Sequence, residues 1–551
     1  MKQFKFLQPL PPPFTYEEWK DQPFGERLRM LCVAWATQGY GSPASIYVFY
    51  ILKIGLYVGM WGFFCGFNTA LGGWDTIGEW WFKLESLQIA VIWSILFEIL
   101  GLGCGSGALT GRYMPPFGGF LYWLRPRTIK LPLFPGAPLI GKDSRSIIDV
   151  LLYLGLLIFL VRALIAPTID MDHVLPIIVL LPILGVLDKT LYLAARSEHY
   201  VIALACFLFP SDALPALKLV WLAIWWGAAT SKLNLHFPGV VDVMISNHAV
   251  LRSKWLRKKL YKDYPNDLRP STLSAVLAHL GTLTEYLFPL VLLFGTGGDM
   301  TTIALLVMFG FHLYITSSIP MGVPLEWNVI MVFGAFVLFG GHAEVWAFSV
   351  QAPLLIGVLV CSLVLLPVLG NLFPERISFL LSMRYYAGNW AYSAWLFKGE
   401  SEDKLDDHLV KVSQTVGKQL DGFYEKSVSE LLISKVIAFR HMHLHGRALH
   451  ELIPKAVDDI EQYTYRDGEL VAGVVLGWNF GEGHLHGTQL LSSIQKRCKF
   501  ESGELRCIMV ESQPLFKPYM AWKIVDAKDG VIETGRTNVK ALLDLQPWPT
   551  R

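Results

Sequence analysis

The chain has 551 residues, of which 53% are apolar and only 17% are charged, and its mean hydropathy is +0.42. A soluble protein carries about a quarter charged residues, so this composition excludes an ordinary soluble enzyme, a disordered chain and a secreted disulfide scaffold. The net charge is +2, which indicates no nucleic-acid partner. Residues 45–372 hold 38 Asp, Glu, Lys and Arg, whereas the shorter stretch 373–551 holds 45. The sequence therefore predicts an N-terminal segment (1–44), a membrane part (45–372) and a soluble part (373–551).

The membrane part contains a series of apolar runs that are each about 20 residues long, the length needed to cross a bilayer as a helix. A further apolar stretch, 198–210, is short, and it is either a half-length helix packed inside the bundle or a re-entrant arm. Residues 105–125 are aromatic and Gly-rich, which is typical of an interfacial segment. We expect a mainly α fold, a polytopic helical bundle of about 9–10 transmembrane segments. The nine long runs are 45–67, 86–104, 146–167, 174–195, 213–231, 271–296, 301–318, 327–348 and 353–372.

The distribution of Lys and Arg predicts the orientation of these spans. The N-terminal segment holds five of them, the 105–145 connection six and the 232–270 connection eight, whereas residues 271–372 hold none. Placing the rich connections inside the cell puts both termini in the cytoplasm of a multi-pass inner-membrane protein. Because four spans separate the 232–270 connection from residue 373, the soluble part should lie on the same side as that connection.

The soluble part is predicted to be a small α+β domain. Apolar positions recur every three to four residues within 402–465, which indicates helices. Residues 470–478 and 505–510 are predicted strands, and 519–525 pairs with 531–534 across an Asp529-Gly530 turn. Residues 487–497 are consistent with a helix between the strands. No glycine pattern typical of nucleotide binding opens a helix here.

Several ionisable residues lie within or beside the apolar runs, where they are costly and often functional. Each also has a structural interpretation. Adjacent Asp and Lys at a helix end can pair, a lysine after a span can snorkel to the interface, and histidines or glutamates can hydrogen-bond between helices. The residues in question are Glu98, Asp188, Lys189, His199, Lys232, Glu285 and His312.

Taken together, these residues form a pattern. The stretches Asp188-Lys189-Thr190, His199-Tyr200 and Lys232-Leu233 are followed by Thr282-x-x-Glu285 and Phe311-His312-Leu313. Over residues 45–350 this pattern resembles the vitamin K-dependent gamma-carboxylase and its bacterial relatives in the horizontally transferred transmembrane (HTTM) superfamily.

The resemblance implies a membrane enzyme in which Lys232 is the base that deprotonates a reduced quinone. His199 and His312 would assist binding or stabilise the oxyanion, and Asp188, Lys189, Asn234 and Glu285 would contribute to substrate binding. A lysine acts as a base only when it is neutral, and desolvation between apolar helices favours the neutral form.

Two histidine motifs lie in the soluble part. His441, His443 and His445 could share a face and bind a metal, but they have no paired acidic ligand, so we expect no metal there. His484-x-His486 follows a Gly-rich turn, and the 479–487 loop could bind a ligand at the membrane. The seven cysteines show no CxxC spacing, so no disulfide framework is expected.

Three functions are compatible with these observations. The first is a membrane enzyme acting on a lipophilic substrate, such as a quinone, an isoprenoid or an acyl lipid. The second is a lipid-binding or scaffolding membrane protein without catalysis, and the third is a transporter. In each case membrane lipids are the expected partners, while the substrate and the oligomeric state are left open. For the first function, we expect Lys232, His199 and His312 to face a common cavity.

Overall fold

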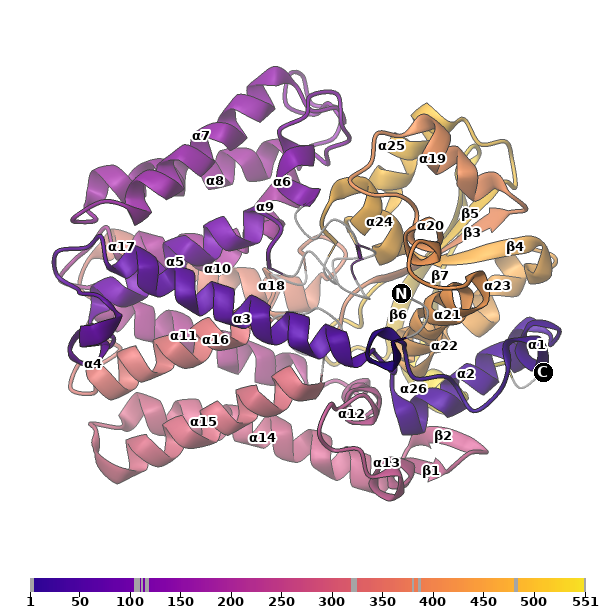
Figure 1. Ribbon diagram of the computed structural model, residues 1–551, viewed down its shortest axis with the longest axis horizontal. Helices are drawn as coiled ribbons and strands as arrows, with labels where there is room; N and C mark the ends of the chain where they lie inside the picture. Colours follow the sequence, from indigo (N-terminus) through magenta and orange to yellow (C-terminus); the bar gives the residue numbers. More distant parts are fainter. Residues whose placement is uncertain are drawn as a thin grey trace.

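The computed structural model describes residues 4–103, 110, 112–113, 118–318, 325–378, 381–384, 388–479 and 484–549. It is about 60% helical, as the mainly α prediction requires. Figure 1 shows two parts side by side, a bundle of long helices from the first two thirds of the chain and a region of mixed strands and helices from the last third. We call the second part the C-terminal α+β region (residues 388–549).

Six helices in the described residues are long and apolar enough to cross a membrane. They have 18 to 23 residues, or roughly 27 to 35 Å at 1.5 Å per residue, which matches the hydrocarbon core. They are α3 (Ala44–Cys65), α7 (Ile147–Leu164), α11 (Ala213–Ser231), α14 (Thr272–Phe294), α15 (Gly298–Ser318) and the run Pro353–Leu372, which comprises α17 (Pro353–Val360), a π-helical turn and α18 (Leu366–Leu372).

The other three predicted spans form shorter helices. They are α5 (Leu84–Ile99, 16 residues), α8 (Met171–Leu187, 17 residues) and α16 (Leu325–Ala335), which a π-helical turn extends to Gly341. Residues 86–99 of α5 are all buried, so this run is apolar because it forms the centre of the bundle. A run of apolar residues does not distinguish a lipid-facing span from a buried core helix, which is why the sequence predicted nine full spans.

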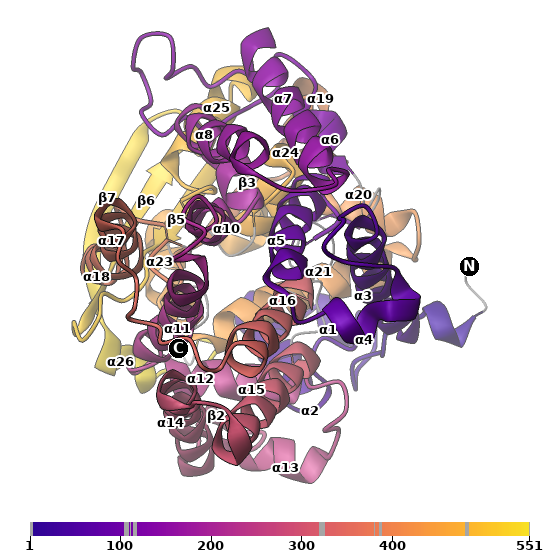
Figure 2. The ribbon, with the colours of Figure 1, turned by 90° about the vertical axis from the view of Figure 1, so that its left-hand side faces the viewer.

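The short apolar stretch predicted at 198–210 is a half-length helix inside the bundle. This helix, α10 (Ser197–Cys206), contacts α5, α8, α11 and α17, and Figure 2 shows it between α8 and α11. It follows the short α9 (Lys189–Ala194). Of the predicted interfacial segment 105–125, residues 105–109, 111 and 114–117 lie outside the described residues, and α6 (Gly118–Trp123) lies near its end.

The connection after α11 contains two short helices and a small hairpin. They are α12 (Phe237–Ser246), α13 (Lys254–Lys259) and the antiparallel pair β1 (Tyr261–Asp263) and β2 (Asp267–Pro270). At the opposite end of the bundle, α4 (Ile77–Trp80) precedes α5.

The C-terminal α+β region is built on an antiparallel five-stranded sheet with the strand order β4-β3-β5-β6-β7. Two predictions are confirmed, because residues 505–510 form a strand and a hairpin turns at Asp529-Gly530. Gly530 has φ +84°, a conformation that glycine adopts readily at such a turn. The strands are β3 (Tyr392–Lys398), β4 (Tyr463–Asp467), β5 (Leu505–Val510), β6 (Tyr519–Asp526) and β7 (Gly530–Asn538).

The prediction of a strand at 470–478 was wrong, because these residues belong to α24 (Gly468–Leu476). Asp467 caps this helix by accepting a hydrogen bond from the Glu469 N–H, and Gly477 ends it in the left-handed conformation. A buried helix rich in valine resembles a strand in sequence. The sequence also did not indicate β3 or β4, and β4 ends the stretch that was predicted to be helical.

Helices cover the sheet and link it to the N-terminal segment. In Figure 1, α1 and α2 lie beside the C-terminal α+β region rather than the bundle, and α2 packs on α21. The helix predicted at 487–497 is present as α25. These helices are α1 (Tyr16–Lys20), α2 (Phe24–Gln38), α19 (Lys404–His408), α20 (Val416–Asp421), α21 (Lys426–Met442), α22 (Leu444–Arg447), α23 (Leu449–Ala456), α25 (Thr488–Cys498) and α26 (Val539–Leu543).

Candidate functional site

A cavity of about 860 Å³ lies where the helical bundle meets the C-terminal sheet. One wall comes from α8, α9 and the start of α18, and the other from β3, β5, β6, β7 and the start of α25. Residues 375–378 and 381, after α18, also line the cavity. The volume is that of a typical small-molecule site.

The sheet wall of the cavity follows from the strand register. Ser393 of β3 pairs with Met509 of β5, Met509 pairs with Lys523 of β6, and Lys523 pairs with Thr534 of β7. Directly opposed residues on adjacent strands point to the same face, so these four side chains form one row across the sheet. All four line the cavity, which therefore has a mixed apolar and polar floor.

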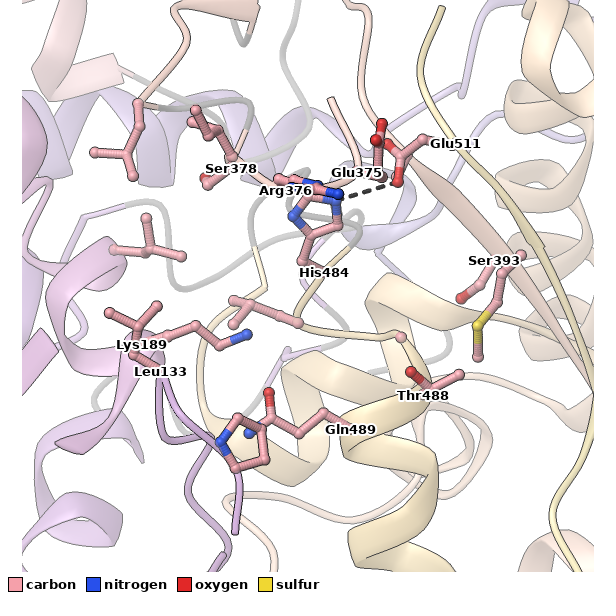
Figure 3. A pocket seen from close by; sticks show the side chains of 18 of the residues that line it. Leu133, Lys189, Glu375, Arg376, Ser378, Ser393, His484, Thr488, Gln489 and Glu511 are labelled. Carbon is pink, nitrogen blue, oxygen red and sulfur yellow. Dashed lines mark hydrogen bonds and ion pairs between the residues drawn. The ribbon is translucent and has the colours of Figure 1, made fainter. Parts of the chain in front are cut away.

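A histidine–carboxylate pair lies at one end of the cavity. The His484 Nε2 and Glu511 Oε2 atoms are 3.2 Å apart, and Figure 3 shows this pair near Arg376. Burial raises the pKa of the Glu511 carboxyl, but His484, Arg384 and the Ser512 N–H outweigh burial and hold it at about 2. Glu511 is therefore a carboxylate at neutral pH.

Cationic side chains enter the cavity from three directions. Lys189 comes from the helix wall, Arg376 from the connection after α18, and Lys523 from the sheet. The pKa of Lys523 is lowered, because the effect of burial outweighs that of the nearby Glu511, which raises it. The lining thus contains these three basic side chains but only two carboxylates, Glu375 and Glu511. Glu511 already has His484 as a partner. The polar end of the cavity therefore favours an anion.

The helix wall is apolar and continues into the lipid-facing surface. Pro182, Gly185 and Val186 of α8 line the cavity, and so does Leu366 of α18. A Cβ atom on Gly185 would lie 2.7 Å from the Tyr192 ring, so glycine permits the close contact between α8 and α9. The outward faces of both helices expose large apolar side chains: Leu175, Val179 and Ile183 on α8, and Val368 and Leu369 on α18.

Of the seven predicted site residues, Lys189 lines this cavity. Its neighbour Asp188 is buried and has a structural role. It pairs with the buried Arg145, and it accepts hydrogen bonds from the N–H groups of Leu131 and Thr190. Asp188 thereby caps α9 and fixes the position from which Lys189 extends.

Lys232 and Glu285 form a buried ion pair between α11 and α14. The Lys232 ammonium also lies over two aromatic rings, 5.7 Å from the centre of Phe237 and 5.5 Å from that of Phe311. Asn234, two residues later, accepts a hydrogen bond from the Phe516 N–H at 2.9 Å and donates one to the Gln513 carbonyl. The end of α11 is thus attached to the C-terminal α+β region, which lies on Lys232's side of the bundle.

His312 has protein partners at both ring nitrogens. The Trp225 indole donates to Nε2 at 3.1 Å, so Nδ1 carries the proton and donates to the Asn328 amide oxygen at 2.7 Å. Phe311, the residue before His312, contacts Lys232, which places Lys232 and His312 in the same neighbourhood. The arrangement matches the structural interpretation of a hydrogen-bonded bundle histidine.

His199 belongs to another buried polar group. Its ring lies 5.1 Å from that of Trp327 on α16, and its Nδ1 lies 3.4 Å from the Glu198 carboxylate. Two ion pairs lie close by, Arg196 with Glu98 at 2.7 Å and Lys53 with Glu326 at 3.8 Å. The lining of the 860 Å³ cavity includes none of Lys232, His199 and His312. That Lys232, His199 and His312 face one cavity of their own stays a prediction.

In the histidine motifs of the soluble part, His441, His443, His445 and His486 are buried, whereas His484 is half-buried. His441, His443 and His445 follow one another along α21 and α22, and no group of three or more metal-ligating side chains occurs among the residues that the structure describes. Six cysteines in the same residues are free thiols, and Cys104 lies outside them. The His486 Nδ1 atom and the Ser393 hydroxyl form a hydrogen bond of 2.6 Å.

The sequence did not single out most of the residues that line the cavity. Arg376, Ser393, Glu511 and Lys523 are far apart in the sequence and match no motif. The available signal was the Gly-rich 479–487 loop, which was predicted as a possible ligand-binding loop at the membrane. Its residues 484, 485 and 487 do line the cavity, while 480–483 lie outside the described residues.

The fold and the site define a polytopic helical membrane protein with a ligand-sized cavity between its bundle and an α+β region. The chain belongs to the family described as "Transmembrane protein of unknown function (DUF3556)", whose sequence model matches residues 4–551. No curated protein and no solved structure matches the chain. These comparisons show no link to the carboxylase or the HTTM superfamily, and that resemblance stays a prediction.

Proposed function

We propose that this membrane protein binds an amphiphile with an anionic headgroup in the 860 Å³ cavity. The observation that carries the proposal is the composition of the two walls. The helix wall is apolar apart from Lys189 and continues into the lipid-facing sides of α8 and α18, whereas Arg376 enters from the connection after α18 and Lys523 from the sheet. An amphiphile in the bilayer could place its chain along the helices and its headgroup against the cations.

The experiment compares two probes that have the same chain and opposite charge. Dodecyl phosphate is expected to bind the intact protein in a neutral detergent, measured by native mass spectrometry, at least tenfold more tightly than dodecyltrimethylammonium. The K189Q/R376Q variant should lose at least tenfold in affinity for dodecyl phosphate, because each cation supplies a charge-assisted hydrogen bond of roughly 1.5–3 kcal/mol.

The matched control is K540Q, which removes an exposed lysine of α26 outside the cavity and should leave the affinity unchanged. Equal affinity for the two probes would contradict the proposal. So would an unchanged affinity in K189Q/R376Q, provided that its melting temperature equals that of the parent protein.

A second candidate function is the lysine-base chemistry that the resemblance implies. The observation that favours it is the burial of Lys232 beside Glu285 and between two aromatic rings. An ion-paired ammonium is not a base, so Lys232 has to pass its proton to Glu285 before it can accept one from a reduced quinone. Glu285 is suitably placed as that acceptor.

This second function predicts that a bound reduced naphthoquinone ionises in the parent protein. The phenolate absorption band should appear at neutral pH on mixing the protein with the quinol, and it should be absent in K232M. The E285Q variant should keep the band, because its neutral amide no longer holds Lys232 as an ammonium and burial then favours the neutral lysine. A band that persists in K232M would rule out Lys232 as the base.

A further inference from the structure

The connection between α12 and α14 forms a compact loop at the ends of several candidate spans. The Ala249 N–H donates to the carbonyl of Ser317 at the end of α15, and the Ser271 N–H, at the start of α14, donates to the carbonyl of Leu260. The Leu268 N–H donates to Gln546 of the C-terminal α+β region at 3.0 Å. The loop therefore lies at the boundary between the bundle and that region, where the spans leave the hydrocarbon.

Apolar side chains of this loop continue the lipid-facing surface of the two helices. Val250, Leu251 and Trp255 are exposed, Val250 at 76% and Trp255 at 70%. The adjoining faces of α14 and α15 expose Leu273, Val276, Leu280 and Leu313. A tryptophan and two aliphatic side chains at the end of an apolar helix surface are typical of the bilayer interface.

Five exposed basic side chains surround these apolar residues. Two acidic residues follow in the hairpin. Asp267 forms a bidentate ion pair with Arg269, and Asp263 is exposed. The loop surface is therefore strongly cationic at the depth of the lipid headgroups. The five residues are Arg252, Lys254, Lys258, Lys259 and Lys262.

Two buried side chains hold the loop in this shape. The Arg257 guanidinium donates to the carbonyls of His248 and Leu251 and, at 2.8 Å, to that of Thr37 in α2. The His248 Nδ1 atom accepts from the N–H groups of Val250 and Leu251, both at 3.0 Å, and its Nε2 bonds to Ser317. The exposed side chains are thus presented by a rigid backbone, which lowers the entropy cost of binding.

We propose that this loop, residues 250–262, is a docking surface for the headgroups of anionic phospholipids. The occupant follows from charge complementarity and from position. The apolar side chains insert at the interface, and the lysines contact lipid phosphates, each worth about 1 kcal/mol near an anionic surface. This surface lies apart from the 860 Å³ cavity and does not depend on the proposed function.

The test captures the lipid that lies beside the loop. A photoreactive benzoylphenylalanine replaces Val250 or, as the matched control, Leu354, which is 70% exposed. Leu354 belongs to α17, which Figure 1 shows at the end of the bundle opposite α13. The intact protein is placed in nanodiscs of phosphatidylcholine and phosphatidylglycerol at a 4:1 ratio, and cross-linked lipids are identified by mass spectrometry. The phosphatidylglycerol share at position 250 should exceed that at position 354 at least about threefold.

The variant K254Q/K258Q/K259Q should reduce this share to the value at position 354. These side chains are exposed, so the melting temperature should not change. Equal phosphatidylglycerol shares at the two positions in the parent protein would overturn the proposal, and so would enrichment that persists in the triple variant.

Discussion

Acidification from pH 7 to pH 5 is expected to destabilise the C-terminal α+β region by several kcal/mol. The cause is a set of buried neutral histidines. Burial lowers the pKa of His443 to about 3, that of His450 to about 4 and that of His486 to about 3, and it lowers the pKa of His441 and His445 well below the usual value.

The direction of the effect follows from proton linkage. Between about pH 6.5 and pH 4 the unfolded chain protonates these histidines while the folded chain does not, so stability falls as the pH falls. At pH 5, each of the three histidines with a defined pKa contributes about 2 kcal/mol of lost stability, or about 6 kcal/mol together. Asp242 has the opposite effect, because burial raises the pKa of its carboxyl and the folded chain therefore binds a proton there that the unfolded chain lacks. This effect amounts to at most one proton.

Urea unfolding followed by tryptophan fluorescence at pH 7, 6 and 5 measures this effect. H450Q should weaken the pH dependence by about one proton, since glutamine keeps a donor for the Gln546 carbonyl but does not titrate. H408Q, which changes an exposed histidine, should leave it unchanged. A free energy of unfolding that stays constant from pH 7 to pH 5 would contradict the prediction.

Replacing Arg440 by methionine is expected to cost at least about 3–5 kcal/mol of stability. Arg440 is buried in α21 and pairs with two buried carboxylates, Asp467 at 2.6 Å and Glu469. Although burial lowers the pKa of its guanidinium, these carboxylates outweigh burial and raise it. Without Arg440, two carboxylates at the start of α24 remain buried and without their cation.

The matched control is R466M, which removes a partly exposed arginine from a surface pair with Glu402 and should cost about 0–1 kcal/mol. The triple variant R440M/D467N/E469Q, which removes the carboxylates as well, should recover part of the loss. Thermal unfolding of the intact protein measures all three. If R440M and R466M lower the melting temperature equally, the buried network does not stabilise the fold as argued.

The class and the broad organisation of this protein follow from its sequence alone. The uneven distribution of charge separates the bundle from the α+β region, and runs of about 20 apolar residues locate the six long helices. The Asp529-Gly530 hairpin and the helix α25 were also predicted correctly. Each of these features depends on composition or on neighbours close in sequence, which is why no tertiary information was needed.

The tertiary structure decided which of the singled-out residues form a common site. Lys189 lines the cavity, whereas Asp188 caps a helix, Lys232 pairs with Glu285, and both nitrogens of His312 are hydrogen-bonded to protein groups. In a membrane the same residue types serve structure and function, because any buried polar group must find a partner. A single sequence does not show which partner that is.

Residues far apart in the sequence form the cavity itself. The row from Ser393 to Thr534 exists because four strands pair in one register, and that register depends on long-range packing. Likewise α5 is a buried core helix and residues 468–476 form a helix rather than a strand, because their surroundings override local preference. Pairing and burial are properties of the folded chain, so only the structure could supply them.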